Sequence, residues 1–375
     1  MLGKIVKRIL QGLGVVLGLV ILIGTVFINV SPEFGGTPTE QDKENYIKSG
    51  HFKEDVFVNI QKTTMDMGWD SIKSLISETM EGGPNKRPDF NIPVLRVTPS
   101  DLKEVNATRL IWFGHSAFLL QIDGKNILLD PMLGDVPSPH PLLGTDRFSK
   151  ELPIEIADLP EIDAIIISHD HYDHLDYGSI EQLKSKTKMF FVPLGVGAHF
   201  KAWGIESKQI VEMDWWQSNL MDGLSISFAP SRHFSGRGIF DRNSTLWGSW
   251  VIKGKTDNIY FSGDGGYGPH FKEIGEKYGP FDLALMECGQ YNPKWGQIHM
   301  MPEQTAQAGM DVQAKTIMPI HWGAFTLALH TWTDPVERVI RKSNTLNLPI
   351  ITPKIGEEIY VTQDGSMYHE KWWEN

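Results

Sequence analysis

The sequence predicts a mixed α/β domain that follows an N-terminal membrane-spanning helix. Residues 9–30 form an uncharged, mostly apolar run that is long enough to cross a bilayer as a helix. Beyond residue 109, short apolar runs that are typical of buried strands alternate with helical segments. Several of these strands are followed at once by histidine or aspartate and then by a small residue. This last pattern indicates that a functional site of histidine and aspartate side chains lies where the strands end.

The composition is that of a globular protein with a large core. The chain has 375 residues, 41% of them hydrophobic, and a formal net charge of −11. An acidic balance does not favour a surface that follows nucleic-acid phosphates, so we expect no nucleic-acid partner. The single cysteine, Cys288, excludes an intramolecular disulfide and a cysteine-rich zinc site. The sequence does not predict an oligomeric state.

The N-terminal segment has the charge pattern of a membrane anchor. Lys4, Lys7 and Arg8 precede the apolar run, and acidic residues follow it. The positive-inside rule then places the N-terminus in the cytoplasm and the remainder on the periplasmic or extracellular side. No clear small-x-small cleavage site follows the run. We therefore expect residues 1–30 to be a single-pass anchor, with a cleaved signal peptide as the alternative.

Residues 31–108 are predicted to form an extension that packs on the main domain. Prolines and glycines at its start indicate a linker. Apolar residues at helical spacing predict a helix over residues 65–80. The rest of this segment has no clean periodicity. The domain that carries the chemistry is then expected to comprise residues 109–375.

The predicted sheet strands follow in order from residue 110. Residues 110–113, 117–122 and 126–129 read as strands joined by tight turns, which indicates an antiparallel or mixed sheet. Further strands are predicted over residues 164–167, 189–192, 224–228, 247–252, 258–261, 281–286 and 316–320. Helices are predicted over residues 178–185, with Asp176 as the N-cap, and over residues 302–314.

Seven histidine and aspartate side chains follow four of these strands. The candidates are His169, His171, Asp173 and His174 after the first of the four, then His233, Asp264 and His321. A lone histidine of this kind is more often a packed or capping residue, so the joint pattern carries the prediction. Asp170 and Tyr172 alternate with the candidates, and we expect them to point away from the others.

Imidazole and carboxylate together suit a borderline divalent metal such as zinc. Seven ligands suffice for two metal ions if one carboxylate bridges them. A pair of ions can supply a hydroxide nucleophile and polarise a substrate oxygen at the same time. The sequence therefore predicts a hydrolase with two Zn²⁺ ions, although sites of this type also accept iron or manganese.

These motifs resemble those of the metallo-β-lactamase superfamily over residues 110–358. The resemblance rests on the His-x-His-x-Asp-His order of residues 169–174 and on the later histidine, aspartate and histidine at strand ends. It implies a four-layer αββα sandwich with the metals at one edge. It also implies that His169, His171 and His233 hold the first zinc, that Asp173, His174 and His321 hold the second, and that Asp264 bridges the two.

Within the superfamily, the chain resembles N-acylphosphatidylethanolamine-hydrolysing phospholipases D and their bacterial relatives. Shared motifs are Trp112-Phe113-Gly114-His115-Ser116, Leu129-Asp130-Pro131, Ser231-Arg232-His233-Phe234-Ser235 and Ile320-His321-Trp322-Gly323. The resemblance implies a zinc-dependent phosphodiesterase that acts on such phospholipids through a metal-bridging hydroxide. It implies catalytic roles for Asp173, Asp264 and His299. His299 would bind a phosphoryl oxygen or assist the leaving group, and a surface cap before the helix at residue 302 is its alternative.

Two other functions are compatible with the sequence. A lactonase or amide hydrolase of the same fold would act on a small carbonyl substrate such as an ester, since the same nucleophile attacks carbon. A non-catalytic metal-binding envelope protein is the third hypothesis. Five aromatic residues are candidates for an acyl-chain groove, with core packing as the alternative: Phe113, Trp215, Trp216, Trp295 and Trp322.

Overall fold

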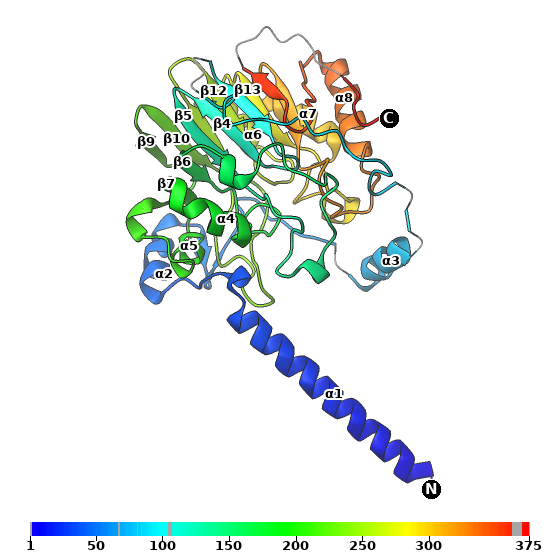
Figure 1. Cartoon of the computed structure of the whole chain (residues 1–375). Helices are drawn as coiled ribbons and strands as arrows, with labels where there is room; N and C mark the ends of the chain where they lie inside the picture. The colour runs from blue at the N-terminus through cyan, green and yellow to red at the C-terminus, as the bar shows by residue number, and fades with distance from the viewer. Residues whose placement is uncertain are drawn as a thin grey trace.

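Two β-sheets lie face to face in the computed structural model, and helices cover their outer faces (Figure 1). The structure describes residues 2–66, 68–80, 82–83, 85–103, 107–361 and 370–374. Parts of the predicted extension and of the predicted 109–375 domain therefore lie outside the described residues. The division of the chain at residues 30 and 108 stays a prediction.

The first sheet has seven strands in the order β15-β3-β4-β5-β6-β7-β8. Its strands are β3 (Arg109–Trp112), β4 (Phe118–Ile122), β5 (Lys125–Leu129), β6 (Ile162–Ile166), β7 (Thr187–Pro193), β8 (Ile210–Met213) and β15 (Glu358–Tyr360). β3, β4 and β5 are antiparallel neighbours, whereas β5 to β8 pair in parallel. The strands β3, β5 and β6 therefore end at the same edge of the sheet.

The second sheet has six strands in the order β14-β13-β12-β11-β10-β9. Its strands are β9 (Ser218–Met221), β10 (Leu224–Ala229), β11 (Ser249–Lys253), β12 (Asn258–Phe261), β13 (Leu283–Glu287) and β14 (Ile317–Ile320). β10 and β12 flank β11 as antiparallel neighbours, and β12 to β14 are parallel. The carboxyl ends of β10, β12, β13 and β14 therefore share one edge.

The strand alternation decides which side chains fill the space between the sheets. Leu110 and Trp112 of β3 join the core shared by both sheets, whereas Ile111 joins a second core on the outer face. α4 (Tyr177–Leu183) and α5 (Gly197–Ala202) cover that outer face, and their side chains Ile180, Leu183 and Phe200 belong to the second core.

Three helices cover the other sheet, which completes the predicted αββα layers (Figure 1). They are α6 (His270–Tyr278), α7 (Pro302–Asp311) and α8 (Asp334–Leu346). The sequence predicted α7, as it did α4 with its cap: the Asp176 carboxylate accepts a 2.8 Å hydrogen bond from the Ser179 amide. α5, α6 and α8 were not predicted. Each is short or mostly polar, and packing against the sheets stabilises its helical conformation more than its own sequence does.

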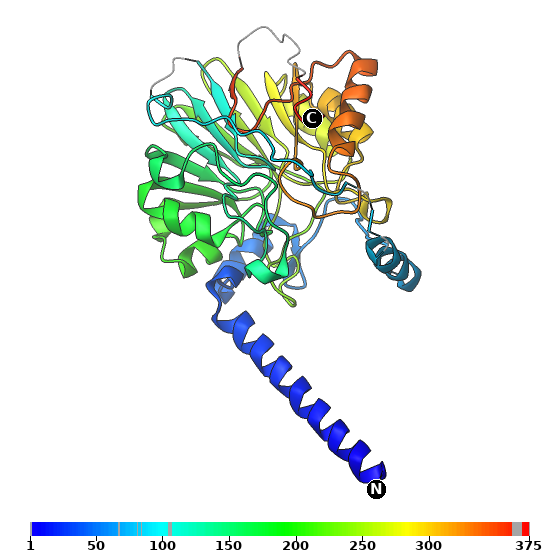
Figure 2. The ribbon, with the colours of Figure 1, turned by 45° about the vertical axis from the view of Figure 1, so that its right-hand side comes forward.

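The N-terminal helix α1 (Leu2–Val30) projects from the body of the molecule (Figures 1 and 2). Among the described residues, it is the one helix apolar and long enough to cross a membrane, with a mean hydropathy of 2.6 and no buried residues in its apolar window. By length and composition it is a candidate membrane anchor or signal sequence. α1 thus confirms the predicted apolar helix.

The segment after α1 is more structured than predicted. It contains α2 (Glu40–Tyr46), a two-stranded ribbon of β1 (Phe52–Lys53) and β2 (Val56–Phe57), and α3 (Trp69–Met80). α3 begins later than the helix predicted over residues 65–80, and residue 67 of that prediction lies outside the described residues. The segment contacts the sandwich directly, since the Trp203 indole donates to the Pro32 carbonyl.

Candidate metal centre

Histidine and aspartate side chains gather where strands of both sheets end. His169 to His174 follow β6, His233 follows β10, Asp264 follows β12 and His321 follows β14. All seven predicted ligands lie in groups whose candidate ligand atoms are within 4.8 Å of one another. Residues up to about 150 positions apart in the sequence thus meet at one edge.

The first group consists of three imidazoles. Nε2 of His169 lies 2.9 Å from Nδ1 of His171, and that atom lies 3.3 Å from Nε2 of His233. Burial lowers the pKa of His171 to about 4 and holds the pKa values of His169 and His233 well below the usual range. The three rings are therefore neutral at pH 7, and their candidate ligand nitrogens lie within 4.8 Å of one another, close enough to share a cation.

The second group adds the carboxylate of Asp173. Nε2 of His174 lies 3.4 Å from Oδ2 of Asp173, and Nε2 of His321 lies 4.0 Å from the same oxygen. His171, Asp173 and His299 are partly exposed, whereas the other histidines of the cluster are buried. Solvent therefore reaches the cluster past these three side chains.

Asp264 lies between the two groups. Its Oδ2 is 3.1 Å from Nε2 of His174 and 3.9 Å from Nε2 of both His169 and His233. Its Oδ1 is 3.2 Å from Nδ1 of His321 but is buried without a hydrogen bond. An unsatisfied buried carboxylate oxygen is costly unless a cation compensates it, so this position fits a metal.

The buried carboxylates of the cluster carry negative charge that a bound metal ion would neutralise. Burial raises the pKa of Asp264 to about 6. Burial opposes protonation of His174, but the carboxylates of Asp264, Asp173 and Asp130 outweigh it and raise the pKa of this histidine well above its usual value. A proton is therefore held where a divalent cation would displace it.

Hydrogen bonds behind the cluster fix the orientation of the rings. Oδ2 of Asp130 lies 2.7 Å from Nδ1 of His174, and the Ser168 amide donates to Oδ1 of Asp130 at 2.7 Å. The Ser168 hydroxyl lies 2.9 Å from Nδ1 of His169, and the Ile298 carbonyl lies 2.9 Å from Nδ1 of His233. In each ring the opposite nitrogen is thereby aimed at the cluster, as is usual for metal-ligating histidines.

Asp170 and Tyr172 point away from the cluster, as predicted. The Asp170 carboxylate accepts hydrogen bonds from the Thr245 hydroxyl at 2.7 Å and from the Gly236 amide at 2.8 Å. The Tyr172 hydroxyl donates to the Arg237 carbonyl at 2.8 Å. Both side chains anchor the loop between β10 and β11 instead.

His299 lies against the cluster. Its ring centroid is 5.0 Å from that of His233 and 5.3 Å from that of His321, and its Nδ1 is 2.8 Å from Oε1 of Glu287. The N-cap of α7 is Met301, so the alternative interpretation of His299 as that cap is wrong. Its catalytic role stays a prediction.

His115 joins the site although the sequence analysis did not select it. Its Nε2 lies 2.9 Å from Oδ2 of Asp173, and the ring is fully buried. His115 and His321 both have positive φ, 55° and 65°, and the amide of His321 donates to the carbonyl of His115. Paired left-handed residues are costly without support and tend to occur at functional sites. The available signal was the strand–histidine–small pattern after β3.

Asp130 and Glu287 were also missed as site residues. Each follows or ends a buried strand, β5 and β13 respectively, and contacts a predicted ligand or His299 from behind. In the sequence each is a single acidic residue after an apolar run. Only the sheet pairing shows that these strand ends lie beside the cluster.

Two glycines allow the turn that carries Asp264. Gly263 has a φ of 54°, where residues other than glycine are strained. A Cβ on Gly266 would lie 2.0 Å from the carbonyl oxygen of Gln297. The glycine-rich sequence therefore lets the Asp264 turn pack directly against the segment that leads to His299.

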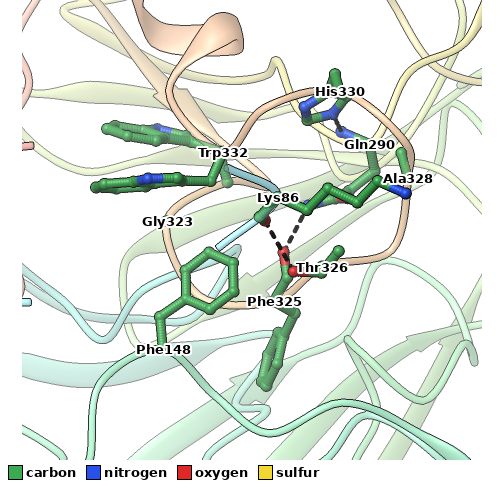
Figure 3. Close-up of a pocket in the computed structure, with 10 residues that line it drawn as sticks. Lys86, Phe148, Gln290, Gly323, Phe325, Thr326, Ala328, His330 and Trp332 are labelled. Atoms are coloured by element: carbon green, nitrogen blue, oxygen red, sulfur yellow. Dashed lines mark hydrogen bonds between the residues drawn. The ribbon is translucent and has the colours of Figure 1, made fainter. Parts of the chain in front are cut away.

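The loop after His321 is fixed by Gln290 and an aromatic cage (Figure 3). The Gln290 amide donates to the Phe325 carbonyl at 3.1 Å and accepts from the Leu327 amide at 2.9 Å. Phe148, Phe325 and Trp332 surround a cavity of about 10 Å³ beside Gln290. This volume suits about one water molecule, so the cavity supports the loop and is too small for a substrate.

Three of the five aromatic candidates for an acyl-chain groove are not available to a ligand. Phe113, Trp215 and Trp322 are buried in the core. Trp216 stacks on Tyr278, and the Trp295 indole donates to the Gln290 carbonyl. Core packing, the alternative for these residues, is therefore correct for the three buried side chains, because large aromatic rings fill the interior between sheet and helices.

Residues 125–322, more than half of the chain, match the family model described as a β-lactamase superfamily domain. The chain belongs to the metallo-β-lactamase superfamily. An uncharacterized protein of Mycobacterium tuberculosis is 39% identical to this superfamily member, over 87% of this chain and 88% of the relative. An N-acyl-phosphatidylethanolamine-hydrolyzing phospholipase D of Caenorhabditis elegans is 33% identical, over 64% of this chain and 70% of its own.

Solved structures agree on the fold of this metallo-β-lactamase superfamily member. A metallo hydrolase from the archaeon Ignicoccus hospitalis superposes with a TM-score of 0.50 and 23% identity, over 68% of this chain and 98% of the other. Superfamily membership and the histidine–aspartate cluster together make this protein a metallo-β-lactamase-fold hydrolase with a divalent-metal site.

Proposed function

We propose that this metallo-β-lactamase-fold hydrolase is a zinc-dependent phosphodiesterase of the phospholipase D type. Its substrates would be phospholipids that resemble N-acylphosphatidylethanolamine. The observation that carries the proposal is the cluster of five histidines and two aspartates at one edge of the sandwich, with His299 against it. The activity for which the Caenorhabditis elegans relative is named supports the lipid class.

Two zinc ions are the proposed occupants of the cluster. His169, His171 and His233 would hold the first, Asp173, His174 and His321 would hold the second, and Asp264 would contact both. Bound divalent cations supply a nucleophile from water near neutral pH and offset negative charge on a phosphate. Zinc suits this ligand set best, and metal analysis of the purified protein would distinguish it from iron or manganese.

Asp173, Asp264 and His299 are the proposed catalytic side chains. Glu287 lies 2.8 Å from Nδ1 of His299, which leaves Nε2 available to substrate. Burial lowers the pKa of His299 and raises the pKa of the Glu287 carboxyl well above its usual value. In the proposed arrangement the protonated Glu287 carboxyl donates to Nδ1, so the neutral ring carries its hydrogen on Nε2. When Nε2 gives up that proton, Nδ1 takes the proton of Glu287, and the ring stays neutral. The proposed role is a hydrogen bond to a phosphoryl oxygen or a proton to the leaving group.

The membrane helix supports a lipid substrate. We infer that α1 is a single-pass anchor and that the hydrolase domain lies on the non-cytoplasmic side, because Lys4, Lys7 and Arg8 precede the apolar stretch. Such an anchor would keep the cluster close to phospholipid. Labelling of an introduced cysteine near Glu40 by a membrane-impermeant reagent in intact cells tests the orientation.

The decisive experiment is hydrolysis of N-acylphosphatidylethanolamine by the zinc-loaded full-length protein. We expect phosphatidic acid and N-acylethanolamine as products, and no turnover after Asp264→Ala. Rapid hydrolysis of a lactone or amide with no lipid product would show the carbonyl hydrolase instead. Metal binding without turnover of any of these substrates would favour the non-catalytic metal-binding protein.

A further inference from the structure

Two loops beside the end of α1 expose large apolar side chains. The first loop, residues 130–161, follows β5, and the second, residues 230–248, joins β10 to β11. Leu142 and Leu143 of the first are 86% and 65% exposed. Ile239 and Phe240 of the second are 69% and 95% exposed. Clustered exposed apolar residues of this size mark an interaction surface.

Both loops lie where α1 meets the body of the molecule (Figures 1 and 2). The ring centroid of Phe27 in α1 is 6.0 Å from that of His140 in the first loop. Ile28 and Asn29 of α1 line a cavity of about 520 Å³ together with Ile239 and Phe240 of the second loop. If α1 spans a bilayer, the tips of both loops therefore lie at its surface.

The second loop also carries a cation suited to a headgroup. The Arg242 guanidinium lies 4.1 Å from the ring centroid of Phe234, and that ring lies 4.4 Å from the ring of His171 in the cluster. Arg242 is exposed. Basic side chains next to apolar anchors bind the phosphate layer of membranes. The second loop thus connects the exposed apolar residues Ile239 and Phe240, through Arg242 and Phe234, to His171 of the metal centre.

We propose that Leu142, Leu143, Ile239 and Phe240 form a membrane-docking surface that enters the same bilayer leaflet from which α1 emerges. Docking turns Arg242 towards the headgroup phosphates and brings the metal cluster to the lipid surface. The partner is the phospholipid bilayer itself, because the patch is continuous with a helix whose apolar window contains no buried residue. This inference rests on the proposed anchoring by α1.

Depth-sensitive spin labelling of the full-length protein in vesicles of phosphatidylcholine and phosphatidylglycerol tests the proposal. Nitroxides are attached at Leu142→Cys and Phe240→Cys, with Leu220→Cys as the matched control. Leu220 is 78% exposed on the edge strand β9, away from α1 (Figure 1). The native Cys288 is buried, so the introduced thiol is the one that reacts.

We expect collisions with a water-soluble nickel chelate to be at least about threefold rarer at positions 142 and 240 than at 220, with frequent oxygen collisions, as for groups in the acyl region. Equal nickel access at all three positions would overturn the docking surface. Shielding of positions 142 and 240 from both nickel and oxygen would indicate a protein partner or a second copy, and would also overturn it.

A fourth label, at Val16→Cys in α1, separates this proposal from the anchor on which it rests. A lipid-exposed label at 16 with water-exposed labels at 142 and 240 refutes docking and leaves the anchor intact. A water-exposed label at 16 refutes both. None of these measurements depends on turnover, so their outcome is independent of the proposed substrate.

Discussion

Asp130 shows how one side chain behind a metal centre can control it. The carboxylate is fully buried, contacts Nδ1 of His174 and accepts from the amide and the hydroxyl of Ser168. It therefore sets the direction of one predicted ligand and, through the Ser168 hydroxyl, contacts a second, His169. Outer partners of this kind tune the basicity and orientation of the ligands that they contact.

The substitution Asp130→Asn should weaken metal binding. It would keep the shape of the side chain but remove the charge that supports His174, so we expect roughly a 10- to 100-fold lower affinity for zinc. Competition with a chromophoric chelator measures it. The matched control is Asp163→Asn, at the opposite end of β6, where the carboxylate pairs with Lys188. Equal affinity in both variants would contradict the role of Asp130.

At the scale of elements, the strands bring the predicted ligands together, and the segment after α1 forms hydrogen bonds with the backbone of one of them, His233. The Asn59 side chain donates to the carbonyl of His233 at 2.7 Å and accepts from its amide at 3.1 Å. This residue follows β2, outside the region that matches the family model. A segment that precedes the sandwich in the chain thus completes the hydrogen bonding of a strand end at the metal centre.

Loss of the Asn59 side chain should therefore loosen the His233 turn. We expect Asn59→Ala to lower the free energy of unfolding by about 1–2 kcal/mol, because two backbone groups lose their partner, and to reduce zinc affinity as well. Chemical denaturation and chelator competition measure the two effects. Asn219→Ala, on the edge strand β9, should change neither; a zinc affinity unchanged by Asn59→Ala would show that His233 is held without this contact.

The α6 helix carries a buried histidine that should make folding sensitive to acid. Burial, with a contribution from Arg232, lowers the pKa of His270 to about 3. Between pH 6.5 and about 3, the unfolded chain binds a proton that the folded chain excludes at this site. Stability is therefore unaffected by this group above pH 6.5 and falls as the pH drops below that value.

His270→Gln should remove this dependence. From pH 7.5 to pH 5.5, we expect the wild-type protein to lose about 1.4 kcal/mol more unfolding free energy than the variant. Urea denaturation at the two pH values measures the difference, with detergent present for α1. Parallel losses in both proteins would show that His270 titrates normally in the folded state.

At the scale of the whole molecule, α1 is separable from the fold that follows it. The residues just after it are fixed by the body, since the Gly36 amide donates to Nδ1 of His199 and the Arg237 guanidinium donates to the Glu33 carbonyl. The apolar window of α1 contains no buried residue. Its removal should leave these contacts in place.

A protein that begins at residue 31 should fold and retain its metal. For the proposed phospholipase activity, we expect hydrolysis of lipid vesicles to fall at least about tenfold, because the anchor would no longer hold the site at the membrane, while hydrolysis of a soluble short-chain phosphodiester stays unchanged. Vesicle co-sedimentation and the two assays check this. An equal fall on both substrates would mean that α1 contributes to the fold or the site rather than to access.

The sequence by itself determined most of the strands of the two sheets and the group of candidate ligands, and its motifs indicated the αββα class through their resemblance to a known superfamily. The short strands β1, β2, β8, β9 and β15 were not predicted. Period-two alternation and short apolar runs depend on local burial, so β6, β10 and β12 could be predicted from their own residues. The ligands at residues 169–174 were visible because they are adjacent in the chain. His233, Asp264 and His321 could be added because each follows a strand in the same way.

Only the tertiary structure decided which distant residues support the cluster. Asp130, Glu287, His115 and Asn59 contact it through sheet pairing and through packing of the N-terminal segment. His115 follows a strand as the predicted ligands do, but Glu287 and Asn59 have no local pattern that distinguishes them from ordinary strand-end or turn residues, and the role of Asp130 behind His174 is not visible in its own motif. The physical reason is that a hydrogen bond between residues far apart in the chain depends on how strands pair and on what packs against them, which no local propensity encodes.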